Sequence, residues 1–335
     1  MGAARTALWA RVGGLRREDV ERALWRERRL VKTWTLRGTL HLLPAADLPV
    51  ALAAIRGGVL RGLQGWAARS GMSPARIDQT IDAIARALAD GPLTRSELTE
   101  RVVARLGPTS RRWLGDPWGG LVRAACLEGR VCFGPDRGRE VTFVARETWI
   151  PRWREVAPGA AEVELLRRYL RGFGPANASD MAAWSGMAVS GVQRALRRAA
   201  PELTLVSWGG RSDWLLREDV KTLLTPRAPG PPRLLPSFDT LLLGYRDKGA
   251  LVEDRDYKRV YRKAGWLSPV VLLDGRVAGV WSSEVRRGCL AVTVQSFTRM
   301  PGAVREEIAV EATSLGRFLG EEVEVAYKGP SGPGP

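Results

Sequence analysis

Apolar positions in the first part of the chain recur with the period of an α-helix, and strand-forming runs follow them. Residues 3–12 and 16–29 each place apolar side chains on one face, and the other faces of the second stretch are rich in arginine. Two β-prone runs, at 30–36 and 38–43, then meet at an Arg-Gly pair, which predicts a tight hairpin. The order helix, helix, hairpin is typical of a winged helix, in which a helix enters a DNA groove and the hairpin forms the wing.

A gapless internal repeat indicates two further copies of this order. Residues 91–98 align on residues 174–181, and both copies place an N-capping residue, Thr94 or Asn177, three positions before an acid. This spacing is the capping box that begins a helix. Helical stretches are predicted at 77–89, 118–128, 163–171 and 190–200, and strand-like runs at 130–133, 141–144, 203–208 and 212–216. Because the flanking pattern repeats as well, domain duplication is favoured over two helix starts that match by chance.

Beyond residue 225 the pattern changes from helical to β. A Pro-rich linker at 226–232 precedes short runs separated by turns, and Asp274-Gly275 is a strong two-residue hairpin signal. Strand-like runs lie at 234–235, 240–243, 270–273, 277–281, 290–294 and 322–327, a helix is predicted at 305–318, and the residues after 328 form a flexible tail. These elements predict a small C-terminal β-barrel-like domain.

The whole chain is therefore predicted to be an α+β protein made of tandem winged-helix (helix-turn-helix) modules followed by that β-rich domain. The predicted divisions are 1–70 for a first winged helix that is incomplete at its N-terminus, 71–157 for the second, 158–225 for the third and 233–328 for the C-terminal domain.

The charge of the chain narrows the class of partner. The net charge is +16, and a field of this sign attracts polyanions such as nucleic acid or an anionic membrane surface. Residues 1–70 carry 13 Lys and Arg against 5 Asp and Glu, so half of the net charge lies in the first fifth of the chain. No apolar run approaches the roughly 20 residues that a membrane span needs. We therefore expect double-stranded DNA as the partner, no membrane, and a monomeric protein.

Few residues suit a metal or a disulfide framework. The three cysteines lack CxxC spacing and the chain holds a single histidine, which argues against zinc and against disulfides. No signal-peptide pattern begins the chain. We expect a cytoplasmic, nucleoid-associated protein without a metal or another cofactor.

The predicted first hairpin is the first place to look for chemistry because it carries the only histidine, His41. Arg37, Thr39 and His41 are spaced by two, so on an extended strand their side chains share one face. One hypothesis is a polar trio that contacts phosphate or a lesion, and the other is a buried histidine bonded to the backbone beside a structural arginine. Candidate phosphate contacts on the preceding basic stretch are Arg26, Arg28, Arg29 and Lys32, although single charges of this kind are often only solvated.

A second group of candidates follows the linker and consists of Asp239, Tyr245 and Arg246. Asp239 and Asp247 are eight positions apart with no histidine near them, which is a weak pattern for paired hydrolytic acids. Trp266 and Trp281 flank the predicted hairpin, and core packing is favoured over stacking on nucleic acid for both.

Four stretches carry a resemblance to a known family: ALWARV at 7–12, WTLRGTLHL at 34–42, LLPSFDTLLLGYR at 234–246 and GWLSPVVLLDGRVAGVW at 265–281. They resemble the winged-helix DNA glycosylases of the AlkZ and YcaQ type, and the likeness spans nearly the whole chain. The resemblance implies a monofunctional, metal-free enzyme of DNA repair that excises alkylated or crosslinked bases from damaged DNA by hydrolysing the N-glycosidic bond.

The resemblance also places the catalytic motif of the family, Gln-x-Gln or Gln-x-Asp, just before the ALWARV helix. Counting back from Leu8-Trp9 puts this motif immediately upstream of Met1, so no residue of the chain is assigned a catalytic role. Either the start of the chain is placed too late or the protein has lost catalysis, and the abrupt beginning of the first helix favours the late start. The alternative function is a non-enzymatic DNA-binding protein, regulatory or architectural, whereas a protein-interaction scaffold is disfavoured by the basic N-terminal segment.

Overall fold

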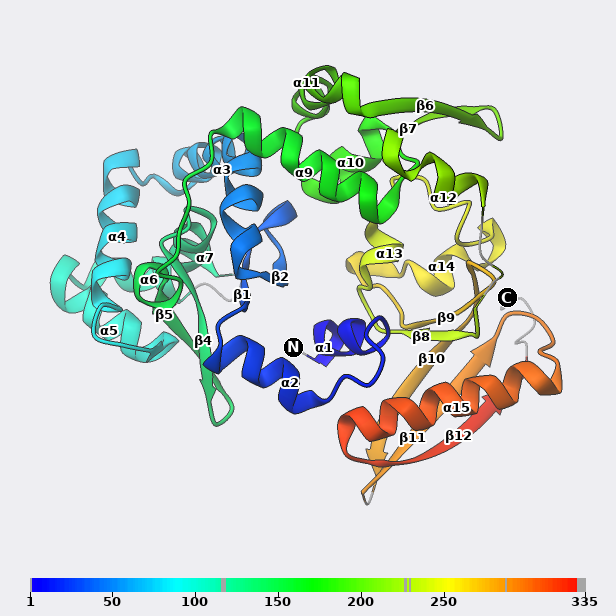
Figure 1. Cartoon of the computed structure of the whole chain (residues 1–335). Helices are drawn as coiled ribbons and strands as arrows, with labels where there is room; N and C mark the ends of the chain where they lie inside the picture. The colour runs from blue at the N-terminus through cyan, green and yellow to red at the C-terminus, as the bar shows by residue number, and fades with distance from the viewer. Residues whose placement is uncertain (1, 116–118, 226–227, 229, 287, 330–335) are drawn as a thin grey trace. The chain divides into compact units, whose positions relative to one another are not determined.

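The computed structural model describes residues 2–115, 119–225, 228, 230–286 and 288–329, apart from the side chains of Gln64, Ala67 and Ala68. Contacts divide the chain into two compact units, one of residues 21–219 and one of residues 1–20 with 220–335. Both units mix helices with sheets (Figure 1), whose strands pair antiparallel except for the parallel pair of the strands at 289–296 and 322–328, which confirms the α+β class. The first 20 residues, expected in the first module, thus group with the C-terminal part.

The first hairpin of the 21–219 unit forms where the strand-prone runs predicted it. Helix α2 (Arg17–Glu21) continues as a π-helical turn (Arg22–Arg26), so the predicted basic helix is short and irregular. Strand β1 (Leu30–Trp34) pairs antiparallel with β2 (Leu40–Pro44), and Thr33 lies opposite His41. The long helix α3 (Leu48–Ser70) follows.

The second group of helices in this unit encloses one apolar core. Its elements are α4 (Pro74–Ala87), α5 (Arg95–Leu106), α6 (Arg111–Leu114), α7 (Gly120–Leu127), α8 (Arg146–Trp149) and a sheet of β3 (Leu93–Thr94), β5 (Glu140–Ala145) and β4 (Val131–Arg137), in that order. Ile84, Leu98 and Phe143 are fully buried in this core. Trp34 of β1 packs against the same core, with its ring 4.8 Å from that of Phe133, so the first hairpin is anchored on the second group. Trp118, where the predicted helix 118–128 began, lies outside the described residues.

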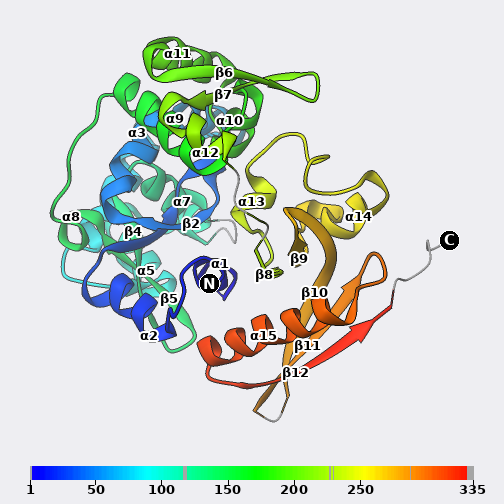
Figure 2. The ribbon, with the colours of Figure 1, turned by 45° about the vertical axis from the view of Figure 1, so that its right-hand side comes forward.

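The third group repeats the arrangement of helices followed by a hairpin. Its elements are α9 (Pro158–Phe173), α10 (Ala178–Ser185), α11 (Val189–Ala199), β6 (Leu203–Trp208) and β7 (Arg211–Leu216). Strands β6 and β7 form a two-stranded antiparallel ribbon (Figure 2). Helix α9 packs along α3, which joins the third group to the first.

The unit of residues 1–20 and 220–335 is built on one five-stranded sheet in the order β12-β11-β10-β9-β8. Its strands are β8 (Arg233–Leu235), β9 (Val270–Leu273), β10 (Arg276–Arg286), β11 (Cys289–Ser296) and β12 (Glu322–Lys328), and its helices are α1 (Gly2–Trp9), α12 (Val220–Leu224), α13 (Thr240–Leu243), α14 (Tyr257–Val260) and α15 (Gly302–Leu319). The Asp274-Gly275 turn joins β9 to β10 as predicted, and the long helix α15 packs against both edge strands (Figure 1).

Two predictions for this part of the chain are wrong, the closed barrel and the strand at 240–243. A third, the linker and the tail, falls largely on residues that the structure does not describe. The described strands form no closed barrel, because the edge strands β8 and β12 pair with β9 and β11 and not with each other. Residues 240–243 form helix α13 and not a strand, since the side chain of Asp239 accepts a hydrogen bond from Leu241 N at 2.9 Å and caps a helix that apolar periodicity alone cannot identify. Much of the predicted linker (226, 227 and 229) and of the tail (330–335) lies outside the described residues.

The two tryptophans of the C-terminal part differ in burial. Trp281 is buried and its indole Nε1 donates to Leu235 O at 2.8 Å, as core packing predicted. Trp266 is 51% exposed, so its predicted burial is wrong. The reason lies in the turn before Trp266, where Ala264 and Gly265 both have positive φ. After this turn the side chain that enters the core is that of Leu267 and not that of Trp266.

Both predicted capping boxes are present. The Thr94 side chain accepts from Glu97 N while Glu97 accepts from Thr94 N, and Asn177 and Asp180 make the same reciprocal pair. Asn177 also donates through Nδ2 to the buried carboxylate of Asp213 at 3.1 Å. The repeat thus encodes two equivalent helix starts, the second of which has an additional tie to β7.

We expect Thr94→Ala to lower the free energy of unfolding by about 1 kcal/mol, since it leaves the Glu97 N–H in the first turn of α5 without an acceptor. Asn177→Ala should cost more, because Asp213 also loses a donor. Urea unfolding of both variants measures this order, with Ser190→Ala, an exposed site on α11, as control. Equal losses in the two cap variants would contradict the added role of Asn177.

Candidate functional site

The turn of the first hairpin brings Thr39 and His41 into contact and gives Arg37 a separate partner. Arg37 has a left-handed backbone, with φ of 54°, so it belongs to the turn and not to the strand. His41 Nε2 lies 2.9 Å from Thr39 Oγ1 and 3.1 Å from Leu36 O, and the Thr39 hydroxyl also donates to Leu36 O. The predicted trio therefore reduces to a contacting pair with an arginine beside it.

His41 is neutral at physiological pH. Burial and the positive charge of Arg37 lower the pKa of His41 to about 4, and its bond to Leu36 O only partly opposes them. Because a carbonyl only accepts, Nε2 carries the hydrogen and Nδ1 is the acceptor. A neutral imidazole offers no charge to a phosphate, but it can present a polar wall or accept a hydrogen bond.

Arg37 connects the hairpin turn to the end of α10. Its Nη1 donates to the main-chain oxygen of Trp184, one of the last carbonyls of that helix, where a cation is favoured. Gly186 follows with φ of 81°, and a Cβ there would lie 3.0 Å from Arg37 N and Cα. Glycine at 186 is thus required for the turn to approach α10 this closely.

Arg37 also forms one wall of a cavity of about 610 Å³. The remaining walls come from α3, α7 and the residues that end α10. Apolar side chains such as Leu63 and Trp66 alternate there with Arg69 and Arg123, and none of the described residues that line the cavity is Asp or Glu. A cavity of this size and mixture of apolar and cationic groups suits an anionic ligand with an apolar part.

Arg123 carries an unsatisfied buried donor within the described part of the chain. Its Nε is buried and has no hydrogen-bond partner among the described residues. A Cβ at Gly38 would collide with the Arg123 guanidinium, so this arginine of α7 packs directly on the hairpin turn. A buried N–H without an acceptor is costly, and an anion in the cavity would supply the acceptor.

The basic residues before the hairpin have different environments. Arg26 is exposed, Arg28 lies over the Trp149 ring at 4.0 Å, and Arg29 pairs with Glu27 at 2.6 Å. These three stay candidates for contact with phosphate, since all are exposed.

Lys32, unlike these three arginines, is buried. Only 3% of Lys32 is exposed. Its Nζ lies 4.5 Å from the centre of the Phe133 ring and 3.9 Å from Asp136 Oδ1. Strand β1 packs against β4, which covers this side chain. Its predicted contact with phosphate is therefore corrected to a structural role.

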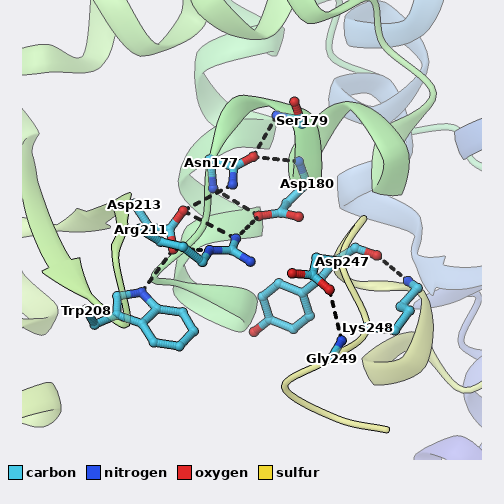
Figure 3. Close-up of polar contacts among 10 residues, drawn as sticks. Asn177, Ser179, Asp180, Trp208, Arg211, Asp213, Asp247, Lys248 and Gly249 are labelled. Atoms are coloured by element: carbon cyan, nitrogen blue, oxygen red, sulfur yellow. Dashed lines mark hydrogen bonds and ion pairs between the residues drawn. The ribbon is translucent and has the colours of Figure 1, made fainter. Parts of the chain in front are cut away.

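In the other unit, Asp239 is a structural residue. Its carboxylate is buried, forms a bidentate ion pair with Arg11 at 2.6 and 2.8 Å, and caps α13. Arg246 is exposed and Tyr245 is half-buried against the core. Near them, Asp247 Oδ1 accepts from Gly249 N at 2.9 Å and Lys248 Nζ donates to Tyr245 O (Figure 3). The contacts of Asp239 count against its use as a hydrolytic acid.

A buried charge network on the third hairpin was not identified as such from the sequence. Arg211 Nη2 lies 3.2 Å from Asp180 Oδ2 and its Nε 3.3 Å from Asp213 Oδ2, and both acids are almost fully buried (Figure 3). The Asp213 carboxylate also accepts from Trp208 Nε1 at 2.9 Å, which fixes the exposed indole at the end of β6. The alternation Arg-Ser-Asp at 211–213 was the available signal, since it places both charges on one face of a strand.

Other common kinds of site are not found in the described residues. No group of three or more His, Cys, Asp and Glu there could hold a metal ion, and no helix there is long and apolar enough to cross a membrane. Burial raises the pKa of Cys126 to about 12 and raises that of Cys132 as well, so neither thiol is a nucleophile at neutral pH.

Known proteins resemble the chain along nearly its whole length. Residues 1–318 match a family described as DNA glycosylase AlkZ-like. A protein of Streptomyces sahachiroi described as an interstrand DNA cross-link repair glycosylase is 34% identical over 313 residues, which are 90% of this chain and 82% of that protein. The solved structure of the Streptomyces sahachiroi DNA glycosylase AlkZ has a TM-score of 0.85 and 30% identity, and the match covers 97% of this chain and 89% of that one.

If the cavity arginines hold a phosphate, Arg123→Gln should weaken binding to duplex DNA and lower the slope of log affinity against log salt by about 1. Fluorescence anisotropy at several salt concentrations measures both quantities. Arg101→Gln is the matched control, because Arg101 is an exposed arginine of α5 that pairs with Asp90 at 3.4 Å. An unchanged slope, or the same change in the control, would exclude this role of Arg123.

His41 should make stability depend on pH. Its pKa falls from an ordinary value of 6.5 to about 4 on folding, so the unfolded chain binds the proton more tightly. The contribution is fully present above pH 6.5 and is lost as the pH falls through 4. Relative to His41→Gln, the natural protein should lose on the order of 1–3 kcal/mol of unfolding free energy across that interval. Urea titrations of both proteins measure the difference, and parallel pH profiles would contradict it.

Proposed function

The chain belongs to the AlkZ-like DNA glycosylase family, and we propose that it repairs interstrand crosslinks by hydrolysing the N-glycosidic bond of alkylated or crosslinked bases. The observation that carries this proposal is the match over residues 1–318, together with 34% identity to a protein described as a crosslink-repair glycosylase. Damaged double-stranded DNA is the proposed substrate, and the net charge of +16 supports its capture. A monomer in the cytoplasm, associated with the nucleoid, fits this role.

The three groups of helix and hairpin are proposed to be winged-helix modules. In this interpretation the ribbons β1–β2, β4–β5 and β6–β7 are the wings. Three features support it: each ribbon follows helices, the second and third groups share a capping-box helix start, and the chain is basic. The module boundaries near residues 70, 157 and 225 belong to the same proposal, with α1 grouped instead with the C-terminal part.

The proposed hydrolysis does not need a strong general acid. A cationic alkylated base is already a good leaving group, so the enzyme mainly needs to stabilise an oxocarbenium-like sugar and to orient water, which an amide or carboxylate can do. His41 is a neutral donor to a backbone carbonyl and Asp239 is held by Arg11. Both residues are proposed to support binding and positioning, and neither is assigned a catalytic role.

The experiment uses one duplex with a cationic alkylated purine and one with an interstrand crosslink, each with an undamaged counterpart. The protein is incubated with them, and abasic sites are measured by strand cleavage in alkali. We expect abasic product from the damaged duplexes and none from their undamaged counterparts. Tight binding to the damaged duplexes without abasic product would favour the alternative, a regulatory or architectural DNA-binding protein.

A further inference from the structure

Two aromatic side chains that are distant in sequence form an exposed pair in the unit of residues 1–20 and 220–335. Phe238 is 43% exposed and Trp266 is 51% exposed, and their ring centroids are 5.1 Å apart at an interplanar angle of 83°. Burying either ring would be favourable by itself, since large aromatic side chains lose considerable apolar area on burial. The stability of the fold therefore does not explain why both rings are exposed.

The backbone holds both rings in this exposed position. Phe238 has φ of 57° and Ala264, in the turn before Trp266, has φ of 58°, and non-glycine residues in this region cost about 1–3 kcal/mol each. On one side, the next residue, Asp239, is fixed by its ion pair with Arg11 and by its cap on α13. On the other side, Arg262 N donates to Trp266 O at 2.8 Å and closes the turn.

Two exposed cations lie beside Trp266. Arg262 and Lys263 lie in the turn that ends at Trp266, and all residues from 262 to 266 are exposed and none is acidic. No ion pair of either cation is found in the described part of the chain. Aromatic faces beside cations are the combination that binds single-stranded nucleic acid, because the bases stack while the cations hold the backbone.

We propose that the Phe238–Trp266 pair is a stacking platform for an unpaired base of the DNA substrate, with Arg262 and Lys263 holding phosphates of the same strand. This inference rests on the proposed function for its choice of nucleic acid. A paired base is covered on both faces by its neighbours in the duplex, so only a base that has left the stack can use the platform. Such a platform recognises an opened or distorted site without reading its sequence.

The test compares a fully paired duplex with the same duplex carrying a short unpaired bubble that contains 2-aminopurine. Stacking on the platform should quench the 2-aminopurine fluorescence when the full-length protein binds. Trp266→Ala should abolish this quenching and weaken bubble binding by about fivefold to a hundredfold, the effect of one lost base stack, and weaken binding to the paired duplex far less. Trp266→Phe should restore most of the quenching, because it keeps an aromatic face.

Two controls keep the test decisive. Val310→Ala removes an apolar side chain that is 67% exposed on α15 of the same unit, and it should leave bubble binding unchanged. Lys263→Gln should weaken bubble binding without abolishing the quenching, and it tests the site even if Trp266→Ala fails to fold.

Absent quenching with the natural protein, or equal losses of affinity for the paired and the bubble duplex in Trp266→Ala, would overturn the platform. Abasic product with no quenching would overturn only this inference, whereas quenching without abasic product would leave the platform standing and contradict the glycosylase.

Discussion

The 21–219 unit depends on the way its first hairpin is anchored on two sides at its turn. Trp34, at the end of β1, inserts against Phe133 and Phe143 in the core of the second group of helices. Arg37, three residues later, donates to the last turn of α10 in the third group. A single two-stranded ribbon is marginally stable alone, so these two anchors decide where its turn lies. The turn of the hairpin thus contacts both the second and the third group.

The arginine-lined cavity lies where these groups meet at the turn. Its walls are the turn of the hairpin, α3, α7 and the end of α10, so no single group of helices could form it. The close contacts at Gly38 and Gly186 leave no space for a larger residue, and they bring the Arg37 and Arg123 side chains to the same space. Because like charges repel more strongly where water is scarce, their convergence is favourable chiefly when an anion is bound between them.

Local patterns in the sequence predicted most of the elements, and long-range packing explains the failures. The capping boxes at Thr94 and Asn177 and the turn at Asp274-Gly275 are encoded by neighbouring residues, and all three are confirmed. Residues 240–243 were assigned to a strand because Thr240 and the three leucines after it have no helical period, and the cap by Asp239 marks them as a helix. Barrel closure, the burial of Lys32 and the exposure of Trp266 depend on partners that are distant in sequence, which periodicity cannot identify.

The candidate cavity and the aromatic pair share a physical feature that connects them to the family stretches. Arg37 lies in WTLRGTLHL and Phe238 in LLPSFDTLLLGYR, and both are non-glycine residues with a left-handed backbone. Folding alone would favour glycine or asparagine at these positions, since either would relieve the strain. The strain is instead offset by contacts around each residue, which are Gly186 and the Trp184 carbonyl for Arg37 and the ion pair of Arg11 with the buried Asp239 carboxylate beside Phe238. Local rules of this kind are broken where a side chain is needed in one fixed place, and the binding roles proposed for Arg37 and Phe238 both require such a fixed side chain.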